Sequence, residues 1–333
     1  MRIGVLGSGS WGTALAMQLC RSGDDVWQWD HRAERAARTQ AERVNSQYLP
    51  GIPLPDNLTV SSDMAAVLDD ATFVVEAIPS QSVRGVMTQA LPHLRADATI
   101  CCASKGIEQS TLMTMDEVLE DVLSTELHRR SAFLAGPSFA KEVARGMPTA
   151  VVVASRDTAT ADLVAEAFHG GPFRAYHTDD IVGAELGGAL KNIIAIATGV
   201  ADGVGAGLNA RAALITRGLA EITRLAVHRG ANPLTLAGLA GMGDLVLTAT
   251  GDLSRNRRLG LGLGAGKTLQ QILDELGQVA EGVVTTRSAR DLAAREGVEM
   301  PICEEVYQML YEDKPAAESL HTLLSRDRRA ERG

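Results

Sequence analysis

The chain opens with the stretch Arg2-Ile3-Gly4-Val5-Leu6-Gly7-Ser8-Gly9-Ser10-Trp11-Gly12, an apolar run followed at once by glycines spaced as GxGxxG. Residues 13–21 have the composition of a helix, so the glycines connect a predicted strand to a predicted helix. In that setting Gly7 allows a tight turn, Gly9 lets the backbone approach a pyrophosphate, and Gly12 lets the helix pack on the strand. Free N–H groups at the start of a helix bind phosphates. The stretch therefore predicts a dinucleotide-binding turn, the alternative being a glycine-rich turn without a ligand.

The first half of the chain alternates short β-rich runs with helical stretches. A second strand is predicted at 25–29, and the later candidates are 73–78, 99–103, 132–135 and 150–154. Strands that alternate with helices imply βαβ units and a mostly parallel sheet. After about residue 180 the pattern is helical, with predicted helices at 182–200, 210–229, 268–276, 282–296 and 303–311.

These patterns predict an α/β fold: an N-terminal Rossmann-type domain with a mostly parallel sheet, and a C-terminal all-α domain. The length of 333 residues also favours two domains over one. We place the first domain at residues 1–183 and the second at 184–333.

Composition restricts the partners and the compartment. A net charge of −9 argues against a nucleic-acid partner. No run approaches the roughly 18 uncharged apolar residues that a membrane span requires. The first strand begins at Arg2, which leaves no room for a signal peptide, so we expect a cytoplasmic protein. The four cysteines, Cys20, Cys101, Cys102 and Cys303, lack metal-ligand spacing and are expected to be buried thiols, with no metal.

Residues after the second strand are expected to contact the adenine ribose of the cofactor. Asp30 stands where an acid can bind the 2′-hydroxyl of NAD. His31 or Arg32 can instead pair with the 2′-phosphate of NADP, and all three residues can equally form a solvated loop. The sequence leaves NAD and NADP both open.

Two lysines stand in unusual surroundings for this acidic chain. Lys105 follows the predicted strand 99–103, at the carboxyl end where open α/β sheets bind ligands, although a surface lysine is equally compatible with this position. Lys191 lies in the stretch 181–200, whose only other charged residue is Glu185. A helix apolar nearly all round is buried, and a buried ammonium needs an acidic partner or a ligand. Burial would also favour a role in proton transfer.

Donors and one acid gather further along the chain. Ser254, Arg255 and Asn256 precede a helical stretch and can donate to a phosphate, the arginine to two oxygens at once. The same residues are also compatible with a simple helix cap. Asp244 is a lone acid in a glycine-rich loop, where it can orient a lysine, hold a substrate hydroxyl or close a turn.

Taken together, these residues resemble the bacterial NAD(P)-dependent glycerol-3-phosphate dehydrogenases, from Ile3 to about Leu320. The stretches that carry the resemblance are 7–12, 45–51, 103–108, 136–142, 191–195, 209–215, 238–245 and 254–256, with Glu281, Gly282 and Thr285.

The resemblance implies a role for each matching residue. It implies that Lys191 is the proton acceptor in the oxidative direction. It implies that the substrate is bound by Lys105, Gly136, Ser138, Lys191, Asp244, Ser254, Arg255 and Asn256. It implies that NAD or NADP is bound by Gly7, Gly9, Ser10, Trp11, Gly12, His31, Arg32, Lys105, Ala140, Arg255, Val279 and Glu281. The family often carries arginine where this chain has His31, which weakens a strict preference for NADP.

The resemblance also implies the reaction, a hydride transfer between the cofactor and dihydroxyacetone phosphate that gives sn-glycerol 3-phosphate for phospholipid synthesis. It further implies a homodimer. The mechanism needs Lys105, Lys191 and Arg255 to converge beside the nicotinamide, and we state this convergence as a prediction. The alternatives are a related two-domain hydroxyacid or hydroxyacyl dehydrogenase and a non-catalytic dinucleotide sensor, because a fold does not determine a substrate.

Overall fold

The computed structural model describes residues 1–277 and 280–325, which form two compact units. The first unit holds Met1–Gly188 and Ala231–Asp244, and the second holds Ala189–Gly230 and the described residues from Leu245 onward. The division at 183/184 expected from the sequence and the division into units at Gly188 and Ala189 both fall within one helix, α9 (Ile181–Gly203). The domain limits themselves stay a prediction.

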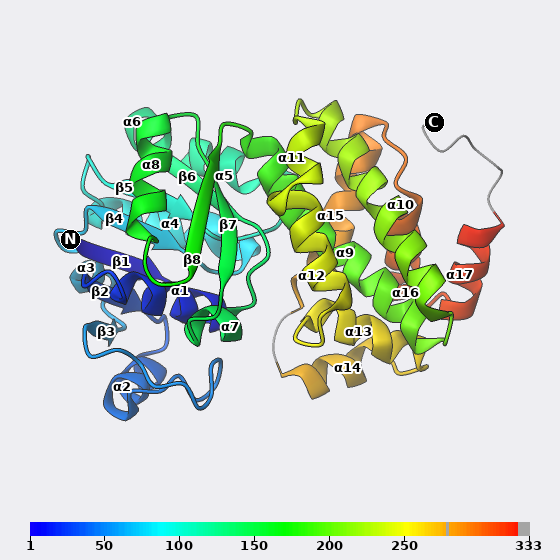
Figure 1. The fold of residues 1–333 in the computed structure, drawn as a ribbon, viewed down its shortest axis with the longest axis horizontal. Coiled ribbons are helices and arrows are strands. Elements are labelled where there is room, and N and C mark those ends of the chain that lie inside the picture. Colours follow the sequence, from blue (N-terminus) through cyan, green and yellow to red (C-terminus); the bar gives the residue numbers. More distant parts are fainter. Residues whose placement is uncertain (278–279, 326–333) are drawn as a thin grey trace. The chain divides into compact units, whose positions relative to one another are not determined.

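An eight-stranded sheet forms the centre of the first unit (Figure 1). Its strand order is β3-β2-β1-β4-β5-β6-β7-β8, and every neighbouring pair is parallel except β6 and β7. The strands are β1 (Arg2–Leu6), β2 (Asp25–Trp29), β3 (Leu58–Ser61), β4 (Phe73–Glu76), β5 (Thr99–Cys102), β6 (Ser131–Ala135), β7 (Thr149–Ala154) and β8 (Phe173–Thr178). The prediction of a mostly parallel sheet is confirmed.

Helices cover both faces of this sheet, so its central strands are buried on each side. Apolar side chains of α1, α7 and α8 pack on one face, and those of α3, α4 and α5 pack on the other. The helices of this unit are α1 (Ser10–Cys20), α2 (Ala33–Glu42), α3 (Met64–Leu68), α4 (Val83–Ala90), α5 (Met115–Val122), α6 (Thr125–Arg129), α7 (Ala140–Ala144), α8 (Thr158–Ala167) and α11 (Pro233–Ala237), with the short turns η1 (Ser80–Ser82), η2 (Leu91–His93) and η3 (Leu239–Gly243).

The described residues of the second unit are helical, as predicted for the C-terminal half. Its helices are the C-terminal part of α9, then α10 (Gly207–His228), α12 (Asp244–Thr250, whose first residue belongs to the first unit), α13 (Arg255–Gly264), α14 (Leu269–Leu276), α15 (Glu281–Glu296), α16 (Pro301–Tyr311) and α17 (Ala316–Leu324). Helices α9 and α13 cross with their backbones in contact. A Cβ at Gly199 would lie 2.2 Å from the Arg257 carbonyl oxygen, and one at Gly260 would lie 2.0 Å from that of Ile196.

Helix α9 is long and apolar enough to span a bilayer by length and composition. However, 89% of its most apolar 18-residue window is buried inside the protein, which is typical of a core helix. The burial expected for this helix is therefore confirmed.

Two strands were not predicted from the sequence. β3 has only four residues, and β8 has an edge position with exposed Arg174, Tyr176 and His177. Short edge strands carry little apolar periodicity, because one side of the ladder has no neighbour and much of the surface faces water.

Candidate active site

The glycine turn after β1 has the geometry of a phosphate cradle. Gly7 has φ +118°, and a Cβ on it would lie 2.4 Å from the Ala77 carbonyl oxygen. A Cβ on Gly12 would lie 2.2 Å from the Gly7 oxygen, so the helix packs directly on the turn. Nothing lies within 4 Å of the position that a Cβ on Gly9 would take. The turn is therefore closed against the protein at Gly7 and Gly12 and open at Gly9, which fits a dinucleotide pyrophosphate.

The first residues of α1 complete this cradle. Gly9 is the N-cap and offers no side chain, so no side-chain cap occupies the first N–H groups of the helix. Ser10 Oγ donates to the Tyr48 carbonyl oxygen at 2.7 Å, which ties the turn to the segment after α2. The indole nitrogen of Trp11 is buried and has no hydrogen-bond partner among the described residues. These features suit an anionic ligand at the start of the helix.

Asp30, directly after β2, is buried and already accepts hydrogen bonds from neighbouring arginines. Asp30 is 1% exposed and accepts from Arg35 Nε at 2.5 Å, Arg35 Nη2 at 2.7 Å and the Arg32 N–H at 2.9 Å. Burial acts to raise the pKa of Asp30, but the hydrogen bonds from Arg35, Ser8 and Arg32 outweigh it and lower this pKa. His31 and Arg32 are exposed beside it. The side chains that face solvent here are thus basic rather than acidic.

Lys105 is held beside the ends of β5 and β6 by an acid distant in sequence. Its Nζ donates to Asp244 Oδ2 at 2.7 Å, across 139 residues of chain, and to the Gly136 carbonyl oxygen at 3.3 Å. Asp244 is 1% exposed, and its carboxylate orients the ammonium. Ser138 Oγ also donates to the Gly136 oxygen, at 3.0 Å. The first unit therefore brings together four of the residues predicted to bind substrate.

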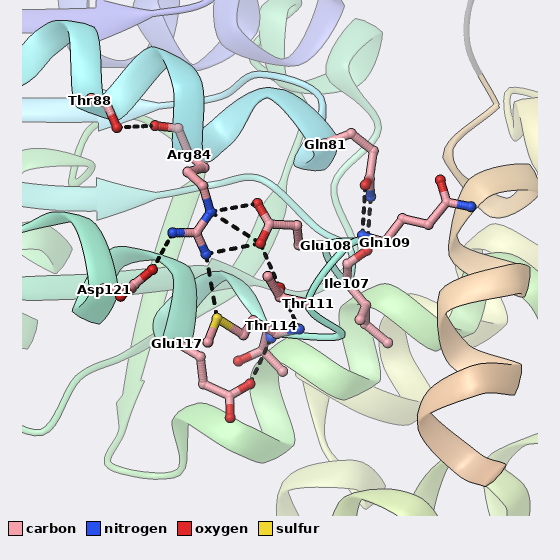
Figure 2. A network of polar contacts seen from close by, with 11 residues as sticks. Gln81, Arg84, Thr88, Ile107, Glu108, Gln109, Thr111, Thr114, Glu117 and Asp121 are labelled. Carbon is pink, nitrogen blue, oxygen red and sulfur yellow. Dashed lines mark hydrogen bonds and ion pairs between the residues drawn. The ribbon is translucent and has the colours of Figure 1, made fainter. Parts of the chain in front are cut away.

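A polar network, drawn in Figure 2, anchors residues 107–111 of the loop that follows β5 and carries Lys105. Arg84 of α4 donates to Glu108 from Nε at 2.9 Å and from Nη2 at 2.9 Å, and Thr111 Oγ1 donates to the same carboxylate at 2.6 Å. Gln81 joins the loop twice, donating to the Ile107 oxygen at 2.8 Å and accepting from the Gln109 N–H at 2.8 Å. The loop that carries Lys105 is therefore attached to α4 and η1 at several points. The Arg84 guanidinium holds the pKa of Glu108 below its usual range.

Glu185 adds a buried acid beside Lys105. A small cavity of about 10 Å³ is lined by Ser104, Lys105 and Glu185 among other residues. Glu185 Oε1 accepts from the Asp116 N–H at 2.9 Å, while Oε2 is buried without a hydrogen-bond partner among the described residues. Burial, followed by the negative charge of Asp116, raises the pKa of Glu185 to about 8. At neutral pH this side chain is therefore mostly the neutral acid.

Lys191 lies in the second unit, buried in α9 as predicted. Its side chain is 9% exposed, and Nζ donates to Thr248 Oγ1 of α12 at 2.9 Å. Thr248 is 4% exposed and was not among the residues predicted from the sequence. The only available signal was its position four residues after Asp244, which places both on one side of a helix.

The Ser254-Arg255-Asn256 segment starts α13, with each side chain in a different setting. Ser254 is the N-cap, 3% exposed, and its Oγ accepts from the Arg257 N–H at 3.2 Å. Asn256 is buried and bridges two elements, because its Nδ2 donates to Asn192 Oδ1 at 2.9 Å and its Oδ1 accepts from the Gly282 N–H at 3.0 Å. Arg255 is exposed. Asn192 stands next to Lys191, so the second unit groups this segment with the buried lysine.

The remaining predicted positions are more dispersed. Ala140 begins α7 and packs partly against the core, and Glu281 begins α15. Val279 lies outside the described residues. Lys105 belongs to one compact unit, whereas Lys191 and Arg255 belong to the other, so their convergence stays a prediction.

All four cysteines are buried, as expected. Within residues 1–277 and 280–325, no three His, Cys, Asp or Glu side chains are grouped as a metal site.

Two family models match the chain. The model described as NAD-dependent glycerol-3-phosphate dehydrogenase N-terminus matches residues 2–161, and the model of the C-terminus of the same family matches residues 180–321. Together they cover most of both units.

Relatives that match the chain over its full length indicate the same family. The chain is 55% identical over 331 residues to the glycerol-3-phosphate dehydrogenase [NAD(P)+] of Anaeromyxobacter sp. (strain K), covering 99% of this chain and 100% of the relative. It is 55% identical to the enzyme of that name from Geobacter sulfurreducens, covering 99% of each. The crystal structure of glycerol-3-phosphate dehydrogenase from Coxiella burnetii is 42% identical with a TM-score of 0.92, covering 97% of this chain and 98% of that one.

Proposed function

The chain belongs to the NAD-dependent glycerol-3-phosphate dehydrogenase family, and from this premise we propose that it interconverts dihydroxyacetone phosphate and sn-glycerol 3-phosphate with NAD or NADP. The observation that carries the proposal is identity of 55% over 99% of the chain to enzymes named for this activity. The phosphate cradle, the Lys105–Asp244 pair and the buried Lys191 supply the chemical groups that the reaction needs.

The residues that would hold the cofactor lie at the glycine turn. Gly9 leaves room for the pyrophosphate, and the first N–H groups of α1, at Ser10, Trp11 and Gly12, favour its charge. When bound, the nicotinamide supplies or accepts the hydride. At the adenosine end Asp30 is held by Arg35, so it offers no selection for NAD, and the exposed His31 and Arg32 favour acceptance of the 2′-phosphate of NADP.

Lys191 carries the proton in this proposal. During reduction the ketone oxygen gains negative charge, and a positioned ammonium both stabilises that oxygen and delivers a proton to it. Thr248 accepts a hydrogen bond from the ammonium and thereby fixes its direction. In the oxidative direction the same lysine accepts the proton from the C2 hydroxyl. Lys105, oriented by Asp244, is proposed to bind the substrate and to support the same charge.

Ser254, Arg255 and Asn256 are proposed to bind the substrate phosphate. A guanidinium matches two phosphate oxygens at once. The Ser254 hydroxyl accepts from the Arg257 N–H and so keeps its own proton for donation to a ligand. Asn256 Nδ2 carries a second proton besides the one donated to Asn192. Anchoring the phosphate would hold C2 in place for reaction.

A steady-state assay tests the function directly. Dihydroxyacetone phosphate is offered with NADH and with NADPH in parallel, and pyruvate and an acetoacetyl thioester serve as control substrates. We expect cofactor oxidation with dihydroxyacetone phosphate alone and sn-glycerol 3-phosphate as the product. Turnover of pyruvate or the thioester in its place would favour another dehydrogenase. Cofactor binding without turnover of any ketone would favour a sensor.

We also propose that the protein is a homodimer. The family resemblance carries this proposal, and Leu208 and Val227, 72% and 42% exposed near the two ends of α10, are apolar side chains that a second copy could cover. Light scattering during gel filtration should give twice the chain mass of 35.2 kDa. A mass of one chain at all concentrations would contradict the dimer.

We infer from the family resemblance that the protein works in the cytoplasm and that its product is the backbone precursor of phospholipids. Cells that lack the chain should then require supplied glycerol for phospholipid synthesis. Fractionation should recover the protein with the cytoplasmic enzymes. Growth without glycerol at an unchanged rate would contradict the proposed use of the product.

A further inference from the structure

Glu76 is a fully buried acid at a junction of the first unit that the proposed mechanism does not use. It is the last residue of β4 and is 0% exposed. β4 lies between β1 and β5, and Glu76 is in register with Leu6 on one side and Cys102 on the other. The glycine turn starts directly after Leu6, and the Lys105 loop starts directly after Cys102. Glu76 therefore lies between the starts of the two segments proposed to bind cofactor and substrate.

The polar partners of Glu76 are neutral. Its Oε1 accepts from the Ile78 N–H at 2.9 Å and lies 2.5 Å from Ser104 Oγ. Its Oε2 lies 3.0 Å from Cys102 Sγ. In the part of the chain that the structure describes, no lysine, arginine or histidine pairs with it. A buried carboxylate without a cation is unfavourable in a low-dielectric interior.

The number of protons available around Ser104 indicates whether the Glu76 carboxyl is neutral or ionised. Ser104 Oγ lies 2.5 Å from Glu76 Oε1 and also 2.5 Å from the Ile78 carbonyl oxygen. Both distances lie in the range of O–H···O hydrogen bonds, and each such bond uses one proton. The serine hydroxyl carries one proton and the peptide carbonyl carries none. If the serine donates to Ile78, the second proton must come from the carboxyl of Glu76.

We propose that Glu76 is a positioning residue that acts as a neutral carboxylic acid, donating its proton to Ser104 and so fixing the peptide that leads into Lys105. The proposal rests on the proposed dehydrogenase function for its kinetic consequences. Glu76 also reaches the cofactor turn, because the Ile78 that it binds packs on Gly7. A Cβ on Gly7 would lie 2.9 Å from Ile78 Cγ2. One buried acid thus sets the position of both segments relative to each other.

Burial raises the pKa of the Glu76 carboxyl, and the hydrogen bonds from Cys102, Ser104 and Ile78 do not offset this. Ionisation of Glu76 as pH rises would leave one proton for three oxygens and push Ser104 away from the end of β4. The proposal therefore predicts that the Lys105 segment loses its position as pH rises.

Other titratable groups face this region and must be separated from Glu76. Cys102 of β5 is a buried thiol whose pKa burial raises far above the usual one, so it stays neutral over the range tested, and Cys101, on the other face of β5, is a buried thiol with a raised pKa as well. The Lys105 ammonium is paired with Asp244. Glu185 of α9 acts on Cys102 and has a pKa of about 8, so it titrates in the relevant range. The variant Glu185→Gln is therefore the matched control.

Infrared spectroscopy tests the protonation state without relying on activity. At pH 7 the wild type should show a carbonyl band of protonated carboxylic acid with contributions from Glu76 and Glu185. The variant Glu76→Gln should lose one contribution, and Glu185→Gln should lose the other. A band unchanged by Glu76→Gln, with the Glu185 contribution still detected, would show that Glu76 is ionised and would overturn the proposal.

Kinetics test the positioning role. Glu76→Gln keeps the size of the side chain but does not titrate, so its kcat/KM for dihydroxyacetone phosphate should persist to higher pH, relative to its own plateau, than that of the wild type. Glu76→Leu and Ser104→Ala should each lose up to about 100-fold in kcat/KM, the scale of a misplacement near 1 Å. Their double variant should lose no more than one of them, because both remove the same contact.

The buried control Cys101→Ala, on the opposite face of β5, should keep wild-type kinetics. An alkaline limb identical in Glu76→Gln and wild type, or wild-type kinetics in Glu76→Leu, would overturn the positioning role. If Glu76→Leu fails to fold, Glu76→Gln and Ser104→Ala still decide the matter. Absence of turnover in the wild type itself would count against the proposed function alone, because the infrared band reports on Glu76 independently.

Discussion

Lys191 is the buried lysine to which the proposed mechanism gives the proton-transfer step. It is 9% exposed in an apolar helix and its ammonium donates to the Thr248 hydroxyl, and a group held in this way can hold and release a proton at a fixed position. We expect Lys191→Ala to lose kcat by roughly 100-fold or more, the usual scale for a general acid. Lys267→Ala is the control, because that lysine is exposed and pairs with Glu275. Turnover near the wild-type rate in Lys191→Ala would remove it from the mechanism.

Arg255 is expected to contribute to binding of the substrate more than to the chemical step. It stands exposed at the first position of α13, where a ligand phosphate can also benefit from the start of the helix. Arg255→Ala should mainly raise KM for dihydroxyacetone phosphate, with a smaller change in kcat. Arg258→Ala, an exposed arginine one turn further along α13, is the control. An unchanged KM in Arg255→Ala would show that the phosphate binds elsewhere.

Arg32 should affect one cofactor more than the other. Because Asp30 is already held by Arg35, the ribose end is left to basic side chains. Loss of one charged hydrogen bond weakens binding by roughly tenfold or more. Arg32→Ala should therefore raise KM for NADPH by about that factor while KM for NADH changes little. An equal change for both cofactors would place Arg32 away from the 2′-phosphate.

At the scale of elements, the Lys105 loop depends on its attachment to α4. Glu108 is buried and receives a bidentate Arg84 guanidinium, so Glu108→Gln removes a charged hydrogen-bond acceptor from a mostly enclosed site. We expect a loss of about 1.5–3 kcal/mol in the free energy of unfolding and a higher KM for substrate. The exposed pair of Arg129 and Glu126 provides the control, since Glu126→Gln should change stability much less than Glu108→Gln does.

The stability contributed by the Arg84–Glu108 pair depends on pH. The pKa of Glu108 is lowered in the folded protein by Arg84, so its contribution is present above the ordinary carboxyl pKa of 4.5 and is lost as pH falls through the folded value. Thermal unfolding of the wild type and Glu108→Gln should therefore converge in acid. A difference that stayed constant down to strongly acidic pH would mean that the lost stability is not electrostatic.

At the scale of the whole molecule, buried neutral acids should make the protein less stable as pH rises. The unfolded chain releases the Glu185 proton near pH 4.5, whereas the folded protein retains it up to about pH 8. Between these values the unfolded state binds fewer protons, so rising pH favours unfolding. Glu185→Gln should lack this part of the decline. Parallel pH profiles of the unfolding midpoint for wild type and variant would contradict the raised pKa.

The sequence by itself predicted six of the eight strands of the sheet, the helical character of the C-terminal half and the cofactor turn. Apolar runs in the first half and the long apolar stretch around Lys191 reflect burial that each residue experiences locally, so periodicity was sufficient to predict β1, β4, β5 and α9. GxGxxG was equally informative, since the backbone freedom of Gly7 and the close approach at Gly12 are properties of those residues. β3 and β8 were missed because short, partly exposed strands carry almost no such signal.

Only the tertiary structure decided which polar groups meet. Asp244 lies 139 residues from Lys105, Thr248 lies 57 from Lys191, and Ser104 lies 28 from Glu76. Local pattern says which side of an element is buried, but not which distant side chain reaches it. That choice depends on strand order and on the path of the chain between elements. The buried acids follow the same logic, because their protonation is set by neighbours that no single stretch of sequence contains.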